Sequence, residues 1–319
     1  MKKQKSKAAE VSKLKRRYAA SKLAVHIFRY FFLIAVSYVI IFQLVYMISY
    51  AVRPSSEMTD LTVVWVPKHF VLSNFKQAAN FLNYAKSFLN TVTVQILSGL
   101  TEVLTCAIAA YGFARFKYKG QNIMFLLVLL TILVPPQMTA IPMNLNYSHF
   151  DVFGILGLIG KIIGHDIRPN LLDTGFVFWL PSVFGAGLRS GLCIFIYRQF
   201  FKSLPRELEE AAYLDGAGAL KTFFRVIIPS SGVAFLTVCI FSVVWHWNDY
   251  YLSVLFLNDK YPLSVQLMQL SNNATGAGVT IDRGTLMAAC LLFILPILFM
   301  YIILQRKFIR SIDRVGIVG

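Results

Sequence analysis

Charged side chains are scarce in this sequence: Asp, Glu, Lys and Arg make up 14% of it, whereas a soluble domain carries about 25%. Acidic residues are the scarcer kind, with 15 Asp and Glu against 31 Lys and Arg. Hydrophobic residues reach 57%, and the mean hydropathy is +0.62. These values exclude an ordinary soluble globular domain and indicate a membrane protein.

Patterns for catalysis and for metal binding are also missing. The sequence has no G-x-x-x-x-G-K-[ST] phosphate loop, because the nearest run, Gly216–Thr222, lacks the glycine before its lysine. The four cysteines lie in apolar runs without metal-ligand spacing, so we expect buried, reduced thiols and no metal site. No Ser/His/Asp or paired-carboxylate pattern stands out. We therefore expect no catalytic residues, no ATP hydrolysis and no cofactor bound by this chain. The cysteines are Cys106, Cys193, Cys239 and Cys290.

The basic residues are clustered rather than spread along the chain. Ten of the 31 Lys and Arg lie in Met1–Arg29, just before or within the start of the first long apolar run. A basic segment beside such a run is typical of membrane orientation, so we expect no nucleic-acid partner. That run, Val25–Ser49, is too long for a signal peptide and lacks a clear cleavage site, so we expect a retained first span.

Six apolar runs reach the roughly 20 residues that a membrane-spanning helix needs. The sequence therefore predicts an all-α polytopic membrane protein with six transmembrane helices. Its transmembrane domain covers 25–305, between a basic tail over 1–24 and a second tail over 306–319. Val152–Ile163 is apolar but too short and contains Lys161, so we expect it at the external interface. The six runs are Val25–Ser49, Phe88–Phe113, Ile123–Met143, Gly175–Tyr197, Val233–Leu257 and Thr285–Leu304.

The segments between these runs predict the orientation. The two tails and the segments after the second and fourth runs carry 22 Lys and Arg, against eight on the other side. Because positive loops stay inside, we expect both termini in the cytoplasm, together with the segment between the fourth and fifth runs.

That cytoplasmic segment, residues 202–229, is the longest polar interruption in the C-terminal half. Pro205 and the glutamates after it favour a helix start, and Gly216 and Gly218 can turn the chain. A second helix would then carry a one-sided apolar stripe and end at Pro229. These residues alone predict a helix–turn–helix hairpin docked at the membrane surface. The stripe is Leu220, Phe223, Phe224, Ile227 and Ile228.

Glu210-Ala211-Ala212, Asp215-Gly216-Ala217 and Ile228-Pro229 at this spacing resemble the EAA loop of ABC importer permeases. The surrounding chain resembles the carbohydrate-uptake, maltose-type branch of that family, notably at Ser87–Thr91, Ala109–Phe116 and Trp247-Asn248-Asp249. The resemblance implies that the loop is a coupling helix inserted into a cleft of an ATPase subunit. The residues that it marks for coupling are Glu207, Glu210, Ala211, Ala212, Asp215, Gly216, Ala217, Phe224 and Pro229.

The resemblance also implies the partners. They are a second homologous permease subunit, two ATPase subunits that bind ATP and Mg, and an extracytoplasmic sugar-binding protein. In the family, that protein faces the loop corresponding to Ser271–Gly278, and related C-terminal tails can reach the ATPase. The implied location is the plasma membrane of a prokaryote, among lipid, and the implied substrates are oligosaccharides, glycosides or polyols.

Candidates for the substrate pathway are residues that break or polarise the apolar runs. Pro136 follows a second proline, so the third span is either simply kinked there or unwound to line a cavity. Arg189 either pairs with a neighbouring subunit, lines the pathway or reaches to the interface. The aromatic and amide groups near the end of the fifth run suit a sugar, but an aromatic belt would look the same. Those residues are Trp245, Trp247, Asn248 and Asp249.

Two other classes of function remain open at this point. An ion-coupled secondary transporter or channel would use Asp249 or Arg189 as its coupling charge. A polytopic membrane enzyme would use His246 with Asp249, whereas His246 has no second ligand near it for a metal. The three classes differ in what they need: a separate ATPase, an ion gradient, or turnover that is lost in His246→Ala.

Overall fold

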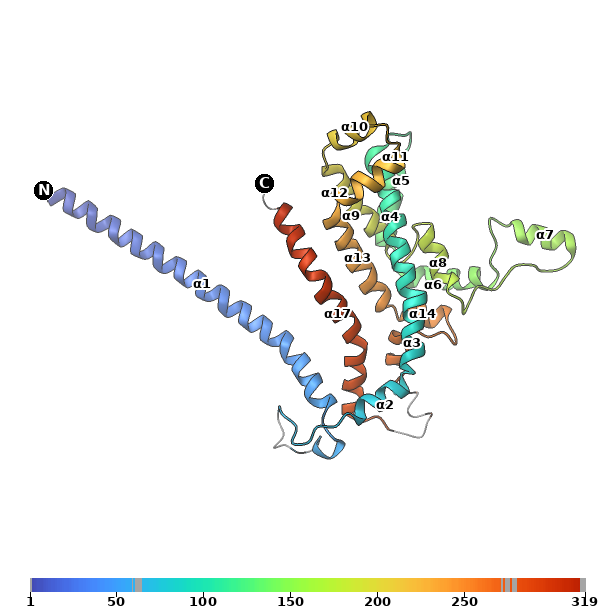
Figure 1. Ribbon diagram of the computed structural model, residues 1–319, viewed down its shortest axis with the longest axis horizontal. Helices are drawn as coiled ribbons and strands as arrows, with labels where there is room; N and C mark the ends of the chain where they lie inside the picture. The colour runs from blue at the N-terminus through green and yellow to red at the C-terminus, as the bar shows by residue number, and fades with distance from the viewer. Residues whose placement is uncertain are drawn as a thin grey trace. The chain divides into compact units, whose positions relative to one another are not determined.

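The computed structural model describes the backbone of residues 2–58, 60, 65–270, 272, 276 and 280–315. Most of the loop 271–278 and the last four residues lie outside this part, and so do the roles expected for them. Every regular element in the described part is a helix (Figure 1). The chain divides into two units, Met1–Phe75 with Asp282–Leu291, and Lys76–Ile281 with Leu292–Gly319. Each is described separately.

The first unit is built on one long helix and a compact external loop. Helix α1 (Lys2–Ala51) contains both the basic tail and the first predicted span, and its side chains from Leu23 to Ile41 are exposed. Such an apolar, exposed surface is what a helix in contact with lipid presents. After α1, a short 3₁₀ turn, η1 (Ser55–Glu57), precedes α2 (Ser73–Phe81). The loop is fixed by the buried Asn74, whose amide donates to the carbonyls of Ala51 and Arg53.

The second unit is organised around one straight helix. Helix α3 (Tyr84–Asn90), the π-helical turn η2 (Thr91–Ile96) and α4 (Leu97–Arg115) form a continuous apolar helix over residues 84–115. It contains the second predicted span. Helix α4 packs against α8 (Phe176–Val183), α9 (Ser190–Ser203) and α13 (Gly232–Trp247), so it lies at the centre of this unit.

The neighbours of α4 are broken where the sequence places helix breakers. Helix α5 (Gln121–Leu133) meets α6 (Pro136–Ser148) at an angle of 101°, with Pro135 at the junction. The chain then forms α7 (Ile155–Ile163), a nine-residue helix too short to span a bilayer. The fourth predicted span is interrupted between α8 and α9, and the fifth between α13 and α14 (Tyr251–Phe256).

The polar segment forms the predicted hairpin. Helix α10 (Glu207–Leu214) is followed by a turn and by a helix made of α11 (Ala219–Thr222), the π-helical η3 (Phe223–Ile227) and α12 (Ile228–Ser230). The prediction that Pro229 ends this helix is wrong by one residue, because the helix continues to Ser230. Pro229 lies within the last helical turn, and the chain bends by 84° after Ser230, where α13 begins. Helix α15 (Leu263–Met268) and α17 (Arg283–Val315) complete the chain.

Three of the six predicted spans are therefore interrupted helices. Among the described residues, Ser21–Ala51, Tyr84–Arg115 and Arg283–Gln305 are long and apolar enough to cross a membrane alone. The bent pairs 121–148 and 219–247 raise the number to at most five. The count of six spans, the position of the termini and the domain limits stay predictions.

Candidate functional site

The turn of the hairpin is held by a glycine in the left-handed conformation. Gly216 has φ = +76°, its N–H donates to the Tyr213 carbonyl, and the Ala217 N–H donates to the Ala212 carbonyl at 2.9 Å. These two bonds form a Schellman motif, which satisfies the last carbonyls of α10. Asp215 lies between α10 and this glycine. The sequence Asp-Gly-Ala therefore fixes the angle between α10 and α11.

A buried ion pair attaches α10 to the end of α4. The Arg115 Nε lies 2.7 Å from the Glu209 Oε1, and the two side chains are only 6% and 9% exposed. The same guanidinium donates to the Leu204 carbonyl, at the end of α9, at 2.9 Å. Removing one partner of such a pair is costly because the other charge stays buried. The hairpin is thus fixed to the central helix at its start.

An aromatic cluster attaches the second half of the hairpin to α4. The Tyr111 ring lies 5.0 Å from that of Phe223 and 6.2 Å from that of Phe201, and all three side chains are buried. Edge-to-face and tilted pairs of this kind add stability beyond the area that they bury. Both halves of the hairpin therefore contact one helix, α4.

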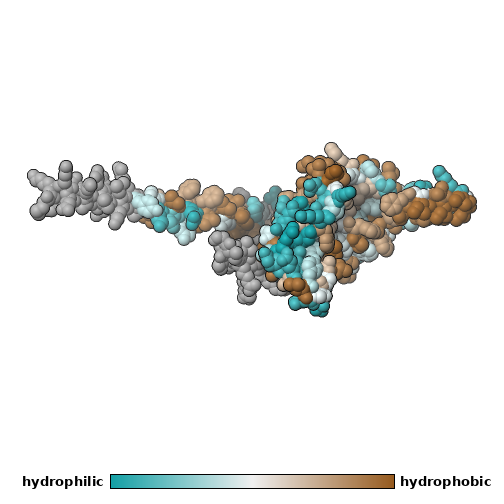
Figure 2. Space-filling model, turned by 90° about the horizontal axis from the view of Figure 1, so that it is seen from above, coloured by the Kyte–Doolittle hydropathy of each residue, from teal (hydrophilic) through white to brown (hydrophobic). Residues whose placement is uncertain are grey.

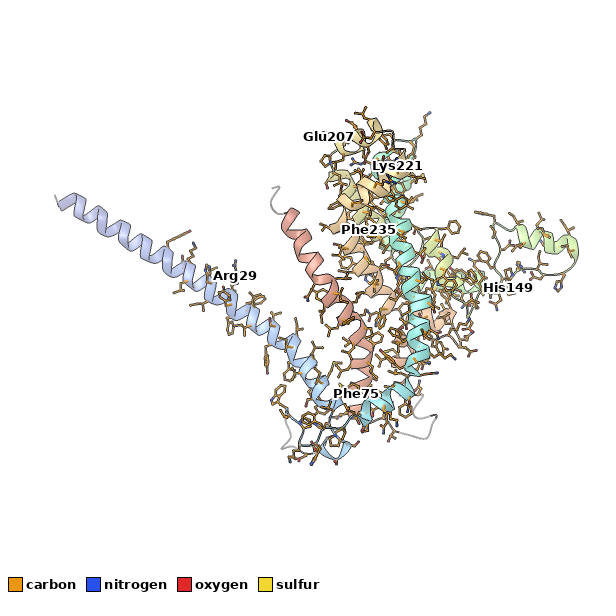
Figure 3. The ribbon with its side chains drawn as sticks, viewed as in Figure 1. Arg29, Phe75, His149, Glu207, Lys221 and Phe235 are labelled. Atoms are coloured by element: carbon orange, nitrogen blue, oxygen red, sulfur yellow. The ribbon has the colours of Figure 1, made fainter. Side chains whose placement is uncertain are left out.

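The outer face of the hairpin is left free. Leu214 is 89% exposed, Leu220 69% and Phe224 52%. Figure 2, which looks onto this end of the second unit, shows hydrophilic residues with a few hydrophobic ones among them. Glu207 and Lys221 lie at the same end in Figure 3. The hairpin thus presents a mixed apolar and charged surface.

The predicted coupling residues divide by exposure. Glu207, Glu210, Ala211, Asp215 and Gly216 are exposed, as are Phe224 and Pro229. Ala212 is buried and Ala217 half-buried. Most of the predicted set is therefore available to a partner on the hairpin, whereas Ala212 serves the packing and capping of α10.

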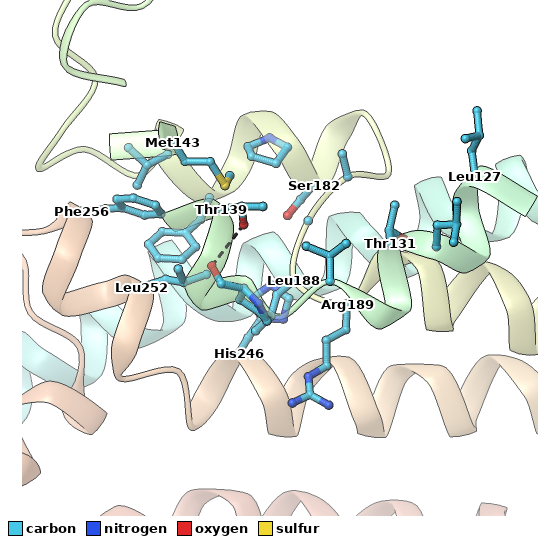
Figure 4. A pocket seen from close by; sticks show the side chains of 18 residues that line it. Leu127, Thr131, Thr139, Met143, Ser182, Leu188, Arg189, His246, Leu252 and Phe256 are labelled. Carbon is cyan, nitrogen blue, oxygen red and sulfur yellow. Dashed lines mark hydrogen bonds between the residues drawn. The ribbon is translucent and has the colours of Figure 1, made fainter. Parts of the chain in front are cut away.

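A cavity of about 390 Å³ lies where the helix breaks meet. It is lined by α5, α6, α8, α13 and α14, together with the segment between α8 and α9 (Figure 4). Its walls are largely aliphatic and aromatic, with the hydroxyls of Thr131, Thr139 and Ser182 and the side chains of Arg189 and His246 as polar groups. A second hollow of about 560 Å³ adjoins it between α5 and α9. The breaks thus surround space in the middle of the apolar helices.

Two of the predicted pathway residues lie at this cavity. Pro136 is the first residue of α6 and Arg189 is the residue before α9, and both line both hollows. Arg189 is not inside a helix, as the sequence suggested, but has a strained backbone with φ = +60°. Its guanidinium carbon lies 5.1 Å from the ring centre of Trp245, which favours a packing role for Trp245.

Trp247, Asn248 and Asp249 do not line either hollow among the described residues. Asp249 accepts hydrogen bonds from the backbone N–H and the hydroxyl of Ser253, so it caps α14. The Trp247 ring packs between Phe88 and Phe293. Asn248 is exposed, and its amide donates to the backbone of its own helix. Within this chain Trp247 packs and Asp249 caps a helix, while the role of all three residues in the pathway stays a prediction.

Sequence reasoning missed Glu102. This side chain is fully buried in the middle of α4, accepts a 2.6 Å hydrogen bond from Ser190 and lies 3.4 Å from the His246 ring. Gly187 borders the cavity beside it, and a Cβ there would lie 2.7 Å from the Ser182 hydroxyl and 3.2 Å from the Glu102 carboxyl carbon. The signal was present, because Glu102 is the only charged residue in Phe88–Phe113.

Apolar helices broken around a cavity, with a polar hairpin fixed to the central helix, are the architecture of a membrane permease. Residues 103–314 match the family described as "Binding-protein-dependent transport system inner membrane component". The chain belongs to this family, and it is a membrane-spanning permease subunit of an ABC importer in the plasma membrane of a prokaryote.

Relatives agree over most of the chain. The probable ABC transporter permease protein YurM of Bacillus subtilis is 27% identical over 96% of this chain and 92% of its own. The diacetylchitobiose uptake system permease protein NgcG of Streptomyces coelicolor is 29% identical over 78% and 75%. A bacterial ABC transporter that imports the acidic polysaccharide alginate has a chain of the same fold. The two structures superpose with a TM-score of 0.68 at 19% sequence identity. The match covers 90% of the present protein and 98% of the alginate transporter's chain.

Proposed function

We propose that this chain is the permease subunit of a sugar importer and that its hairpin, residues 202–229, receives movement from a separate ATPase. The observation that carries the proposal is the attachment of the hairpin. Its inner side is fixed to α4 by the Arg115–Glu209 ion pair and by aromatic packing, while its outer side is exposed. A protein that binds the outer side can therefore move α4 directly.

Separate partner proteins would supply the functions for which this chain has no site. The sequence has no phosphate loop, so ATP and Mg would bind to two separate ATPase subunits. A second permease subunit would complete the pathway, and an extracytoplasmic binding protein would deliver the sugar. The position of both termini and of the hairpin in the cytoplasm rests on the clustering of Lys and Arg.

The broken helices supply the movement. Interrupted spans can swing about their breaks, so closure of the ATPases would move α4 and open the cavity to one side or the other. In energetic terms, nucleotide binding selects one of two conformations because the ATPase grips the hairpin differently in each. This chain would take part without chemical catalysis.

A carbohydrate is the proposed substrate class. The permease from Streptomyces is described as taking up diacetylchitobiose, and the solved transporter as importing alginate. The cavity walls suit such a molecule, because apolar groups contact sugar C–H faces while the hydroxyls of Thr131, Thr139 and Ser182 can bind its hydroxyls. An oligosaccharide would pass through a site shared with the second permease.

Co-purification tests the proposal. Solubilised from its own host, the chain should bring down an ATPase, and uptake into vesicles should need ATP and the binding protein. Uptake by the isolated chain under an ion gradient, without any ATPase, would instead establish the secondary transporter.

Two neighbouring glycines allow a matched test of the hinge. Gly216→Ala should weaken coupling, because alanine at φ = +76° costs about 1–2 kcal/mol and shifts the angle between α10 and α11. Gly218→Ala should change little, because Gly218 has φ = −75° and a Cβ there meets no atom within 4 Å. The measurement is sugar uptake per ATP hydrolysed in proteoliposomes. Equal ratios for both variants would show that the hinge angle does not matter.

A further inference from the structure

A cluster of buried polar side chains joins three helices beside the cavity. Glu102 on α4 accepts the Ser190 hydroxyl of α9 through its Oε1, at 2.6 Å. Its Oε2 has no hydrogen bond and faces the Nε2 of His246 on α13 at 3.4 Å. The two side chains are 0% and 1% exposed, and His246 also lines the cavity. Because a buried charge is costly inside a membrane protein, the protonation state of this carboxyl and imidazole has to be explained.

The other ring nitrogen fixes the tautomer of His246. Its Nδ1 lies 2.9 Å from the Ser242 carbonyl oxygen, which can only accept a hydrogen bond. Nδ1 therefore carries a hydrogen, and in a neutral ring Nε2 has only a lone pair. A carboxylate oxygen facing that lone pair would place two acceptors against each other. The contact is favourable only when a further proton lies on one of the two groups.

We propose that Glu102 and His246 together bind one proton when the helices are packed as in this structure. With one proton the pair is neutral overall, whether as an acid beside a neutral ring or as a carboxylate beside an imidazolium. With no proton, a buried negative charge faces a lone pair. With two, a buried positive charge has no counterion in the pair. Either departure buries a net charge among apolar helices, which is strongly unfavourable.

Few other groups can take over this role. In the part of the chain that the structure describes, the other titratable or charged groups near the pair are the thiols of Cys106 on α4 and Cys193 on α9, which contact each other, and Arg189, which lines the same cavity as His246. The Arg189 guanidinium is placed over the Trp245 ring. The proton therefore belongs to the acid–imidazole pair.

The consequence is a pH-dependent conformational equilibrium, and it rests on the function proposed above. The packed conformation keeps its stability while the proton is held and loses it as the pH rises and the proton leaves. When α4, α9 and α13 separate during transport, water in the cavity can reach the pair and the proton can exchange. The proton need not be transported, since ATP supplies the energy.

The test compares Glu102→Gln with the wild-type chain in the complete transporter. A glutamine oxygen can accept from Ser190, and its amide can donate to His246 Nε2 at every pH. Sugar- and binding-protein-stimulated ATP hydrolysis is measured in proteoliposomes between about pH 6 and about pH 9. The rate of each protein is divided by the rate of the same protein at the lower pH. Beyond the midpoint, the wild-type rate should fall by about tenfold per pH unit, and the variant should stay nearly level.

Controls separate the possible failures. Asp151→Asn, which alters a carboxyl that caps α7, should keep the wild-type profile. If Glu102→Gln does not assemble, His246→Gln serves instead. Glu102 alone then holds the proton, and the alkaline fall in rate should move to lower pH, because the glutamine amide stabilises the carboxylate that faces a lone pair in the wild type. Thermal unfolding of the purified complex should show the same loss of pH dependence. An alkaline limb identical in wild type and variant overturns the proton site, whereas absence of sugar-stimulated hydrolysis at every pH overturns the proposed function.

Discussion

Replacement of Arg115 by methionine is expected to reduce sugar-stimulated ATP hydrolysis and uptake by about tenfold or more, while the chain still inserts in the membrane. The Glu209 carboxylate would be left 9% exposed and without its partner 2.7 Å away. Breaking a buried ion pair in this way costs about 3–5 kcal/mol. Leu204 would lose its hydrogen bond from the same guanidinium. Helix α10 would then separate from α4, and movement of the ATPase would no longer reach the cavity.

A double-mutant cycle provides the control. Arg115→Met combined with Glu209→Leu removes both charges and leaves an apolar contact of similar volume, so it should restore part of the coupling. Uptake and ATP hydrolysis are measured on the same proteoliposomes for all four proteins. If the single variant couples as well as the wild type, the ion pair does not transmit force. If the double variant is worse than both single variants, the charges themselves are needed.

The sequence was most informative where structure depends on near neighbours. The hairpin could be predicted because Asp215, Gly216 and Ala217 form their turn with carbonyls only a few residues away. The break at Pro135 and Pro136 could be predicted for the same reason, since proline acts on the helix that contains it. The angle of this bend, 101°, could not be predicted, because it depends on what α5 and α6 pack against.

Contacts between residues far apart in the sequence could not be predicted. Arg115 pairs with Glu209, a residue 94 positions further along the chain, and only the fold brings the two together. Asp249 stays a predicted pathway residue, and the structure adds that its carboxylate caps the helix that follows. No role was predicted for Glu102 in its apolar run. Its partners Ser190 and His246 lie on α9 and α13, and only the packing of these helices brings them to it.

The outer face of the hairpin gives the second large effect. Leu214→Asp is expected to abolish co-purification of the ATPase and, with it, ATP-driven uptake. At 89% exposure Leu214 contributes almost nothing to the packing of this chain, so the substitution should leave its fold intact. A leucine buried in an interface contributes about 1.5–3 kcal/mol. An aspartate in its place would add the cost of burying an unpartnered charge.

These two effects together weaken binding by more than about a hundredfold, since each 1.4 kcal/mol is a factor of ten. Leu72→Asp is the matched control, because Leu72 has a similar exposure of 74% and lies outside the hairpin. It should leave the amount of bound ATPase unchanged. The amount is measured by quantitative pull-down from detergent, with membrane insertion checked for each variant. An ATPase that binds the Leu214→Asp chain as tightly as the wild type must grip another surface, and the hairpin would then lose its role as the coupling element.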